Sequence, residues 1–67
     1  MIVFKLKEML EKRNITRYKL QQYTDLSLRR INDYYFGKAK FIKVEELDIL
    51  CKTLECKLTD IIEFKNK

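Results

Sequence analysis

The sequence predicts an all-α fold in which five short helices form a single domain over residues 1–67. Three observations lead to this prediction. The chain has one Gly and no Pro, whereas architectures rich in β-turns depend on those residues. Apolar residues recur at spacings of three and four along most of the chain. Finally, small hydroxyl residues stand where they can cap two of the predicted helices.

The first helix is predicted over residues 5–13. Its apolar positions Leu6, Met9 and Leu10 fall on one side of a helix, and charged residues occupy the other side. An apolar stripe of this width is typical of a helix that packs one face against a core. We therefore expect an amphipathic first helix.

Two capped helices follow in quick succession. Thr16 can cap a second helix over about residues 17–24, and Ser27 a third over about residues 28–36, which Gly37 ends. At each start, an apolar residue before the cap is spaced to meet one in the first turn, as in a hydrophobic staple: Ile15 with Leu20, and Leu26 with Ile31. The two helices are thus joined by only two or three residues.

The C-terminal third predicts two further helices. Apolar residues at spacings of three and four mark a fourth helix from Val44 to Leu54. A short fifth helix is expected from about Leu58 to Ile62, because the acidic Asp60 suits a helix N-terminus. The β-prone segments 2–4 and 61–64 could also form a short β pairing between the two ends of the sequence.

The formal net charge of +5 is unevenly distributed. Residues 12–43 carry nine basic and two acidic residues, whereas residues 44–67 carry four basic and six acidic ones. Such an excess favours a polyanionic partner, either nucleic acid or an anionic membrane surface. A membrane partner is disfavoured because the basic residues are spread over several helices and loops. No apolar run is long enough for a signal peptide or a membrane span, so we expect a cytoplasmic protein.

The segment of about residues 16–37, a capped helix, a tight turn and a second capped helix, has the layout of a helix-turn-helix. It contains Thr-Arg-Tyr-Lys-Leu at 16–20, Leu-Ser-Leu-Arg-Arg-Ile-Asn at 26–32 and Phe-Gly-Lys at 36–38. These residues resemble the Cro/lambda-repressor-like helix-turn-helix family, also called xenobiotic-response-element-like. The resemblance continues through 42–48, 50–56 and 60–64, and so covers nearly the whole chain.

The resemblance implies a short, single-domain transcriptional regulator, which we expect to be a repressor. It implies sequence-specific binding of double-stranded DNA by a homodimer on a two-fold site. The sequence departs from the family pattern at Arg17, Gln21 and Asp25, where the family usually has Gln, Ala and Gly. Asp25 tolerates left-handed backbone better than most residues, whereas the longer polar side chain of Gln21 needs a partner at the helix crossing.

The third helix carries the residues expected to contact bases in the major groove. With Ile31 pointing inward, a rotation of 100° per residue places Arg29, Asn32 and Asp33 on the outward side. The fork of Arg29 can donate twice to guanine O6 and N7. The resemblance adds Leu28, against a thymine methyl, and Asp33, which could accept from cytosine N4 or orient Arg29. The predicted base-contacting residues are Leu28, Arg29, Asn32 and Asp33.

Contacts with the DNA backbone are expected from basic residues around this helix. Arg17 begins the second helix, whose free N–H groups favour a phosphate. Arg30 lies on the flank of the third helix, and Lys38, Lys40 and Lys43 lie in the following segment, which the resembling family uses against the backbone. A less specific interpretation makes Arg29 or Arg30 with Asp33 a surface ion pair only.

A competing hypothesis is a protein-interaction module, such as an antitoxin or antirepressor, that keeps this fold. Asp33 on the groove-facing side and the absence of Gln at position 17 favour it. Enzymatic activity is not expected, because the chain has no His and a single Ser, which is assigned to a cap. Cys51 and Cys56 cannot complete a zinc site without further ligands; we interpret them as packed apolar residues, with redox sensing as the alternative. No cofactor, metal or small-molecule ligand is predicted.

Overall fold

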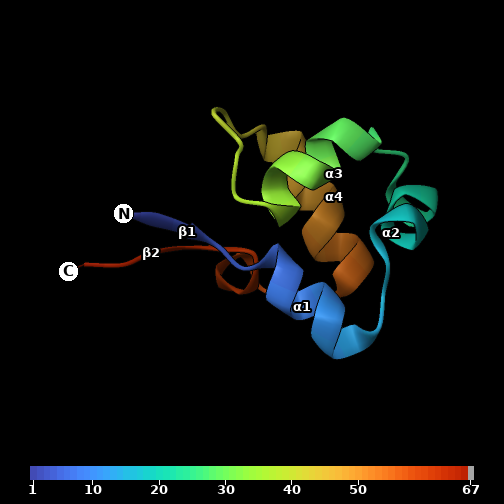
Figure 1. Cartoon of the computed structure of the whole chain (residues 1–67), viewed down its shortest axis with the longest axis horizontal. Coiled ribbons are helices and arrows are strands. Elements are labelled where there is room, and N and C mark those ends of the chain that lie inside the picture. Colours follow the sequence, from blue (N-terminus) through green and yellow to red (C-terminus); the bar gives the residue numbers. More distant parts are fainter. Residues whose placement is uncertain (67) are drawn as a thin grey trace.

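The computed structural model describes residues 1–66, which form a mostly helical fold with a small two-stranded sheet. The elements are β1 (Ile2–Phe4), α1 (Leu6–Arg13), α2 (Arg17–Thr24), α3 (Leu28–Tyr35), α4 (Val44–Leu54), the 3-10 helix η1 (Leu58–Asp60) and β2 (Ile62–Phe64). In Figure 1 the helices gather on one side of the molecule, and the two strands extend side by side from the other, carrying both ends of the chain. The free ends of the strands lie away from the α2–α3 pair, whereas the Phe4 ring of β1 packs near the Tyr34 ring of α3, with centres 6.1 Å apart.

The two predicted N-caps are confirmed. The Thr16 Oγ1 accepts a hydrogen bond from the backbone N–H of Lys19 at 3.0 Å, and the Ser27 Oγ accepts one from Arg30 N–H at 3.2 Å. Each cap satisfies a backbone donor that the first turn of a helix leaves without a partner. α2 and α3 therefore begin directly after their predicted capping residues.

The two helices end in left-handed backbone, as expected. Asp25 follows α2 with φ 61°, and its N–H donates to the Gln21 carbonyl at 2.8 Å. After α3, Gly37 has φ 69°, and Lys38 N–H donates to the Asp33 carbonyl at 2.8 Å. The latter bond is the long hydrogen bond of a Schellman motif, which turns the chain sharply out of a helix. The turn between α2 and α3 thus forms with Asp in place of Gly.

The prediction of a fifth helix in the C-terminal segment is corrected. The fifth helix is a single 3-10 turn, closed by the Ile61 N–H on the Leu58 carbonyl at 2.9 Å. It ends early because Ile62 enters β2 and pairs with Phe4. The five-helix count is therefore not matched: residues 1–66 form four α-helices and an antiparallel sheet in which Ile2 pairs with Phe64. The suggested pairing of the terminal segments is confirmed.

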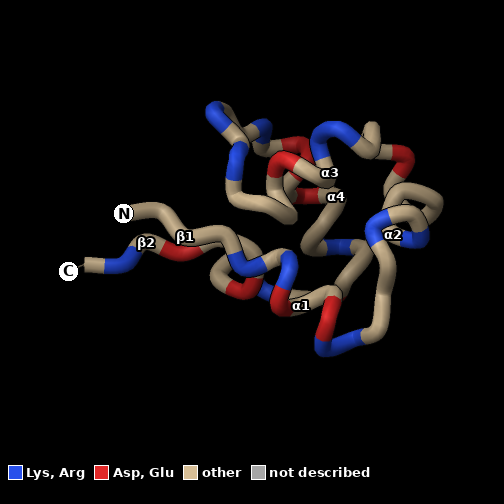
Figure 2. The backbone as a smooth tube through the Cα atoms, viewed as in Figure 1, with Lys and Arg blue, Asp and Glu red and all other residues tan. Residues whose placement is uncertain are grey.

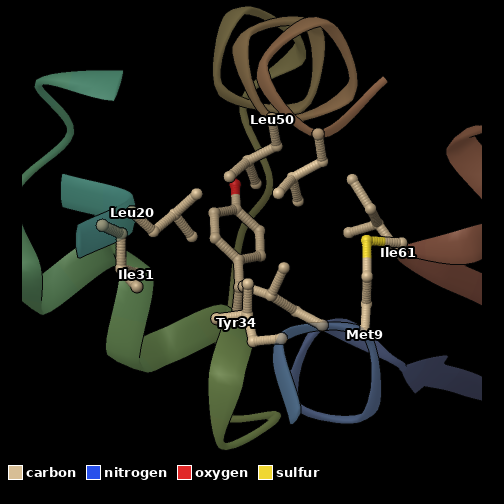
Figure 3. Packing of buried hydrophobic residues seen from close by; sticks show 9 residues of the cluster. Met9, Leu20, Ile31, Tyr34, Leu50 and Ile61 are labelled. Atoms are coloured by element: carbon tan, nitrogen blue, oxygen red, sulfur yellow. The ribbon is translucent and has the colours of Figure 1, made fainter. Parts of the chain in front are cut away.

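The hydrophobic core joins the four α-helices, and Figure 3 shows the Tyr34 ring at its centre, among apolar side chains from α1, α2, α3 and α4. Tyr34, like Leu20, Ile31 and Leu50, is completely buried. The fully or nearly buried members are Leu6, Met9, Leu10, Leu20, Ile31, Tyr34, Leu50, Leu54 and Ile61. This core fixes the crossing of α2 and α3, and so the direction in which the outer side of α3 faces.

The two cysteines pack against this core, in keeping with their interpretation as apolar residues. Both are half-buried and reduced. Burial raises the pKa of the Cys56 thiol, and the neighbouring Cys51 adds to the increase. A raised pKa reduces the fraction of reactive thiolate, so the environment of Cys56 does not activate its thiol.

Candidate nucleic-acid interface

The α2–α3 unit exposes the first turn of α3. Its inner side is anchored by Ile31, which is completely buried, and by the half-buried Leu26 just before the Ser27 cap. On the outer side, Arg29 is exposed and its side chain makes no hydrogen bond or ion pair within residues 1–66. Leu28, also predicted to contact bases, is half-buried. A guanidinium without intramolecular partners keeps all of its donors for a ligand.

Asn32 is held by Arg17 across the α2–α3 crossing. An Arg17 terminal nitrogen donates to the Asn32 Oδ1 at 2.6 Å. The Arg17 guanidinium also lies 5.0 Å from the centre of the Tyr35 ring and 5.1 Å from that of Phe36, within the range of a cation–π contact. The structure thus brings together a predicted backbone-contacting residue and a predicted base-contacting residue.

Asp33 is paired with Arg30 rather than with Arg29. The Arg30 Nη1 lies 3.2 Å from the Asp33 Oδ2, and their side chains are 14% and 30% exposed. Of the two ion pairs considered from the sequence, the structure contains the one between residues three apart. Much of the negative charge that Asp33 would present to DNA is therefore balanced within the protein.

Arg30 also forms a nearly buried cluster with Glu46 of α4 and Tyr34. Its Nη2 donates to the Glu46 Oε1 at 2.8 Å, and its Nε lies 3.1 Å from the Glu46 Oε2. The Tyr34 hydroxyl donates to the Glu46 Oε1 at 2.6 Å. The Glu46 side chain is only 10% exposed. Bidentate, charge-assisted hydrogen bonds of this kind compensate the cost of removing both charges from water.

The hydrogen bonds of the cluster shift the pKa values of its three members. The hydrogen bond from Arg30 lowers the pKa of Glu46, outweighing the effect of burial. Burial and the hydrogen bond to Glu46 raise the pKa of Tyr34. Hydrogen bonding to Glu46 also raises the pKa of Arg30. The ion pair therefore persists at neutral pH.

The same arginine fixes the segment that follows α3. Arg30 Nη2 donates to the Phe41 carbonyl at 2.9 Å, and the guanidinium lies 4.3 Å from the centre of the Phe41 ring. The three predicted backbone-contacting lysines of this segment, Lys38, Lys40 and Lys43, are all exposed. In Figure 2 the basic positions at the start of α3 and in this segment lie along the same edge of the molecule. Arg30 thus holds a basic loop against α3, and Arg29 borders the same hollow as Lys38 and Lys40 of this loop.

Sequence reasoning missed Glu46 and Tyr34 as parts of this site. Glu46 lies in the acidic first turn of α4, where its neighbour Glu45 is exposed. The predicted contact of Arg30 with a DNA phosphate stays a prediction, and the structure adds an internal role for its guanidinium. A weak signal for the cluster was available in the position of Glu46, which lies one residue from Leu47 and four from Leu50 on the inner face of the helix.

Residues 5–67 match the Cro/C1-type HTH DNA-binding domain. The chain belongs to this family. It is also 31% identical over 65 residues to the uncharacterized HTH-type transcriptional regulator YozG of Bacillus subtilis (strain 168), a match that covers 97% of this chain and 77% of that protein. The recognition made from residues 16–38 is therefore confirmed.

Within residues 1–66, no helix is both long enough and apolar enough to cross a bilayer.

Proposed function

We propose that this protein is a transcriptional repressor of the cytoplasm that binds double-stranded DNA sequence-specifically through the major groove. The observation that carries the proposal is the exposed first turn of α3, where Arg29 has no side-chain partner among residues 1–66 and lies beside a basic loop held by Arg30. A helix of this diameter fits the major groove, and its first turn reaches base edges. The similarity to a protein named as a transcriptional regulator supports a regulatory role.

In this proposal Arg29 makes the principal base contact, by donating twice to a guanine. Leu28 contacts a thymine methyl group, and Asn32 and Asp33 contact neighbouring bases. The hydrogen bond of Asn32 to Arg17 and the ion pair of Asp33 with Arg30 restrict the orientations in which these two side chains can do so. Asp33 on the groove-facing side was one of two features that favour the competing protein-interaction module. Its ion pair with Arg30 weakens that support, because a paired carboxylate repels DNA less than an unpaired one.

The basic residues around α3 contact phosphates in this proposal. Lys38, Lys40 and Lys43 lie on the loop beside α3, Arg17 lies at the N-terminus of α2, and Arg30 has its guanidinium between α3 and the loop. Phosphate contacts fix the position of a protein on the duplex without reading sequence. They predict an affinity that falls steeply with salt concentration.

We further propose that the protein binds a two-fold DNA site as a homodimer. Support comes from exposed apolar side chains at the far end of the sheet, where Ile2 is 51%, Leu58 48% and Phe64 63% exposed. These three residues line a common hollow. Apolar side chains grouped on one surface are typical of an interaction site, and this one lies away from the α2–α3 unit (Figure 1).

Selection of bound sequences from a random duplex library tests the whole proposal. The expected result is an enriched two-fold sequence with half-sites about one DNA turn apart, bound less tightly as salt is raised. Sedimentation of the free protein at high micromolar concentration checks the dimer independently, and a monomer there would contradict it. A library that yields no enriched sequence would exclude specific DNA binding and favour the protein-interaction module.

A further inference from the structure

Cys51 and Cys56, the two cysteines of the chain, lie on either side of one sharp turn. Cys51 is in the last turn of α4, and Cys56 follows Glu55, the residue that ends this helix with φ 50°. The Cys56 N–H donates to the Cys51 carbonyl at 3.1 Å. This is the long hydrogen bond of a Schellman motif, in which side chains near the two bonded residues are frequently in contact.

The two thiols are neighbours in the folded protein. Burial raises the pKa of the Cys56 thiol most, and Cys51 raises it further through its charge and through hydrogen bonding between the side chains. Hydrogen bonding requires that the two groups lie close together. Both side chains are half-buried and reduced, so they pack against the core and still have part of their surface in contact with solvent.

The turn at the end of α3 has the same backbone geometry but different chemistry. There the Lys38 N–H donates to the Asp33 carbonyl at 2.8 Å, around the left-handed Gly37. The corresponding positions therefore hold an ammonium and a carboxylate. The turn at the end of α4 has a thiol at both positions, and two adjacent thiols can be joined by oxidation.

We propose that Cys51 and Cys56 are a reversible modification site, at which a low-molecular-weight disulfide oxidises the two thiols to an intramolecular disulfide. A disulfide requires backbone positions that are already close, and the hydrogen bond between the two residues provides this closeness. In a reducing compartment a disulfide of this kind is transient and responds to the redox state. The proposal is independent of DNA binding.

The exchange proceeds in two steps. Cys51 loses its proton to solvent, and its thiolate attacks one sulfur of the small disulfide, which releases one small thiolate and leaves a mixed disulfide on Cys51. The Cys56 thiolate then attacks the Cys51 sulfur, which forms the intramolecular bond and releases the second small thiolate. The two protein thiols are oxidised, the small disulfide is reduced to two thiols, and these take up the two protons. The first attack belongs to Cys51, because the raised pKa of Cys56 keeps more of that thiol protonated.

The disulfide acts on the joint between the helices and the sheet. It closes a ring around the left-handed Glu55 and around Leu54, whose carbonyl accepts a hydrogen bond from Arg13 at the end of α1. η1 begins at Leu58, shortly after this ring, and leads into β2. Oxidation therefore stiffens the turn that connects α4 to the sheet. Neither cysteine is among the residues proposed to contact DNA.

Alkylation of the full chain after equilibration with glutathione buffers tests the proposal. In reduced glutathione alone, iodoacetamide should modify both cysteines. At a high proportion of oxidised glutathione, the mass of the protein should fall by two hydrogens, and no alkyl group should be added. This disulfide should exceed the mixed disulfide with glutathione about tenfold, because the fold holds the second thiol at a high effective concentration. In urea the excess should fall about tenfold, because the unfolded chain no longer holds the thiols together.

Two single variants separate the roles of the thiols. Cys51→Ser and Cys56→Ser should each stop at a mixed disulfide with glutathione. Cys56→Ser, which keeps the attacking Cys51, should acquire glutathione faster than Cys51→Ser, whose remaining thiol has the raised pKa.

Amide hydrogen exchange of the unmodified protein measures the effect on the turn and needs no variant. The Cys56 amide, which donates across the ring, should exchange about tenfold more slowly in the oxidised protein, because local opening of the turn is restricted. The Lys38 amide makes the same type of bond at the end of α3 and is the matched control. Its exchange should be equal in the two forms.

Three results of the alkylation experiment would overturn the proposal: two modifiable thiols at every glutathione ratio, a disulfide that joins two chains, or an equal disulfide excess in urea and in the folded protein. Equal exchange of the Cys56 amide in the reduced and oxidised forms would overturn the effect on the turn. None of these measurements uses DNA, so their outcome does not depend on the proposed function.

Discussion

Arg29 and Arg30 are adjacent in the sequence, yet they lie on two sides of α3 with opposite environments. The Arg29 side is exposed, and its guanidinium has no partner within residues 1–66. The Arg30 side faces α4 and the basic loop, where its guanidinium contacts Glu46, Asp33 and the Phe41 carbonyl. One arginine is thus available to a ligand, and the other joins three parts of the protein.

The difference shows why basic residues in a DNA-binding helix cannot be treated as equivalent. A charge that is already paired inside the protein stabilises the fold and the orientation of the helix, and it adds less to the attraction of DNA. An unpaired charge next to it adds little to the stability of the fold and more to the attraction of DNA. Replacing each arginine in turn should therefore separate folding from recognition.

The largest effect is expected for the stability of Arg30→Met. The variant leaves the Glu46 carboxylate nearly buried without a cation, a situation that costs about 3 kcal/mol. Urea unfolding should show this loss, whereas Arg29→Met should change the free energy of unfolding by less than about 0.5 kcal/mol, as exposed substitutions do.

A double variant sharpens this comparison. In Arg30→Met/Glu46→Leu both charges are gone, so most of the lost stability should return, because the cost comes from the uncompensated carboxylate. Equal stability of Arg30→Met and Arg29→Met would show that the ion pair contributes nothing, and the contrast between the two sides of α3 would disappear.

The next largest effect is expected for DNA recognition by Arg29→Ala. Loss of a bidentate guanine contact should reduce discrimination at one base pair by about 1 to 3 kcal/mol. Lys40→Ala is the matched control: it should weaken all sequences alike and reduce the salt dependence by about one phosphate contact. Both are measured by DNA retardation across a salt series. If Arg29→Ala bound preferred and altered sequences in the unmodified ratio, Arg29 would not read bases.

The smallest effect is a dependence of stability on pH that comes from Glu46. Its pKa is lowered in the folded protein, chiefly by the Arg30 hydrogen bond. The stabilisation is therefore complete above the pKa of an unfolded glutamate, about 4.3. It is lost as the pH falls through the lower, folded value.

Urea unfolding between pH 7 and pH 3 measures this effect. Glu46→Gln should reduce the decline of stability in acid, and the exposed neighbour in Glu45→Gln should leave it unchanged. An identical acid decline in the two variants would remove Glu46 from the explanation.

Much of the fold was predictable because the deciding interactions are local. The Thr16 and Ser27 caps act on backbone groups three residues away, and the left-handed residues Asp25 and Gly37 end their helices through bonds that span four or five residues. The fifth helix was mispredicted because Ile62 pairs with Phe4, far away in the sequence. The spacing of residues within the C-terminal segment contains no information about a pairing with a strand at the other end of the sequence.

The site was less predictable than the fold, because the contacts that define it join residues far apart in the sequence. Helical periodicity identified the outward side of α3, but the partner of each polar residue there comes from another helix. Arg17 reaches Asn32 across 15 residues, and Arg30 reaches Glu46 across 16. Spacing within one helix could not tell that Glu46 is buried while Glu45 is exposed and makes no such contact.

By itself, the sequence determined the four α-helices, the capped turn between the second and third, the family, and the concentration of positive charge over residues 12–43. These features follow from interactions within a few residues of the chain and from composition. The tertiary structure decided which of the charged and polar residues remain available to a ligand. The reason is the packing of α3 against α2 and α4. This packing places the Glu46 carboxylate next to Arg30 and the Arg17 guanidinium next to Asn32, and it leaves the Arg29 side chain without a partner within residues 1–66.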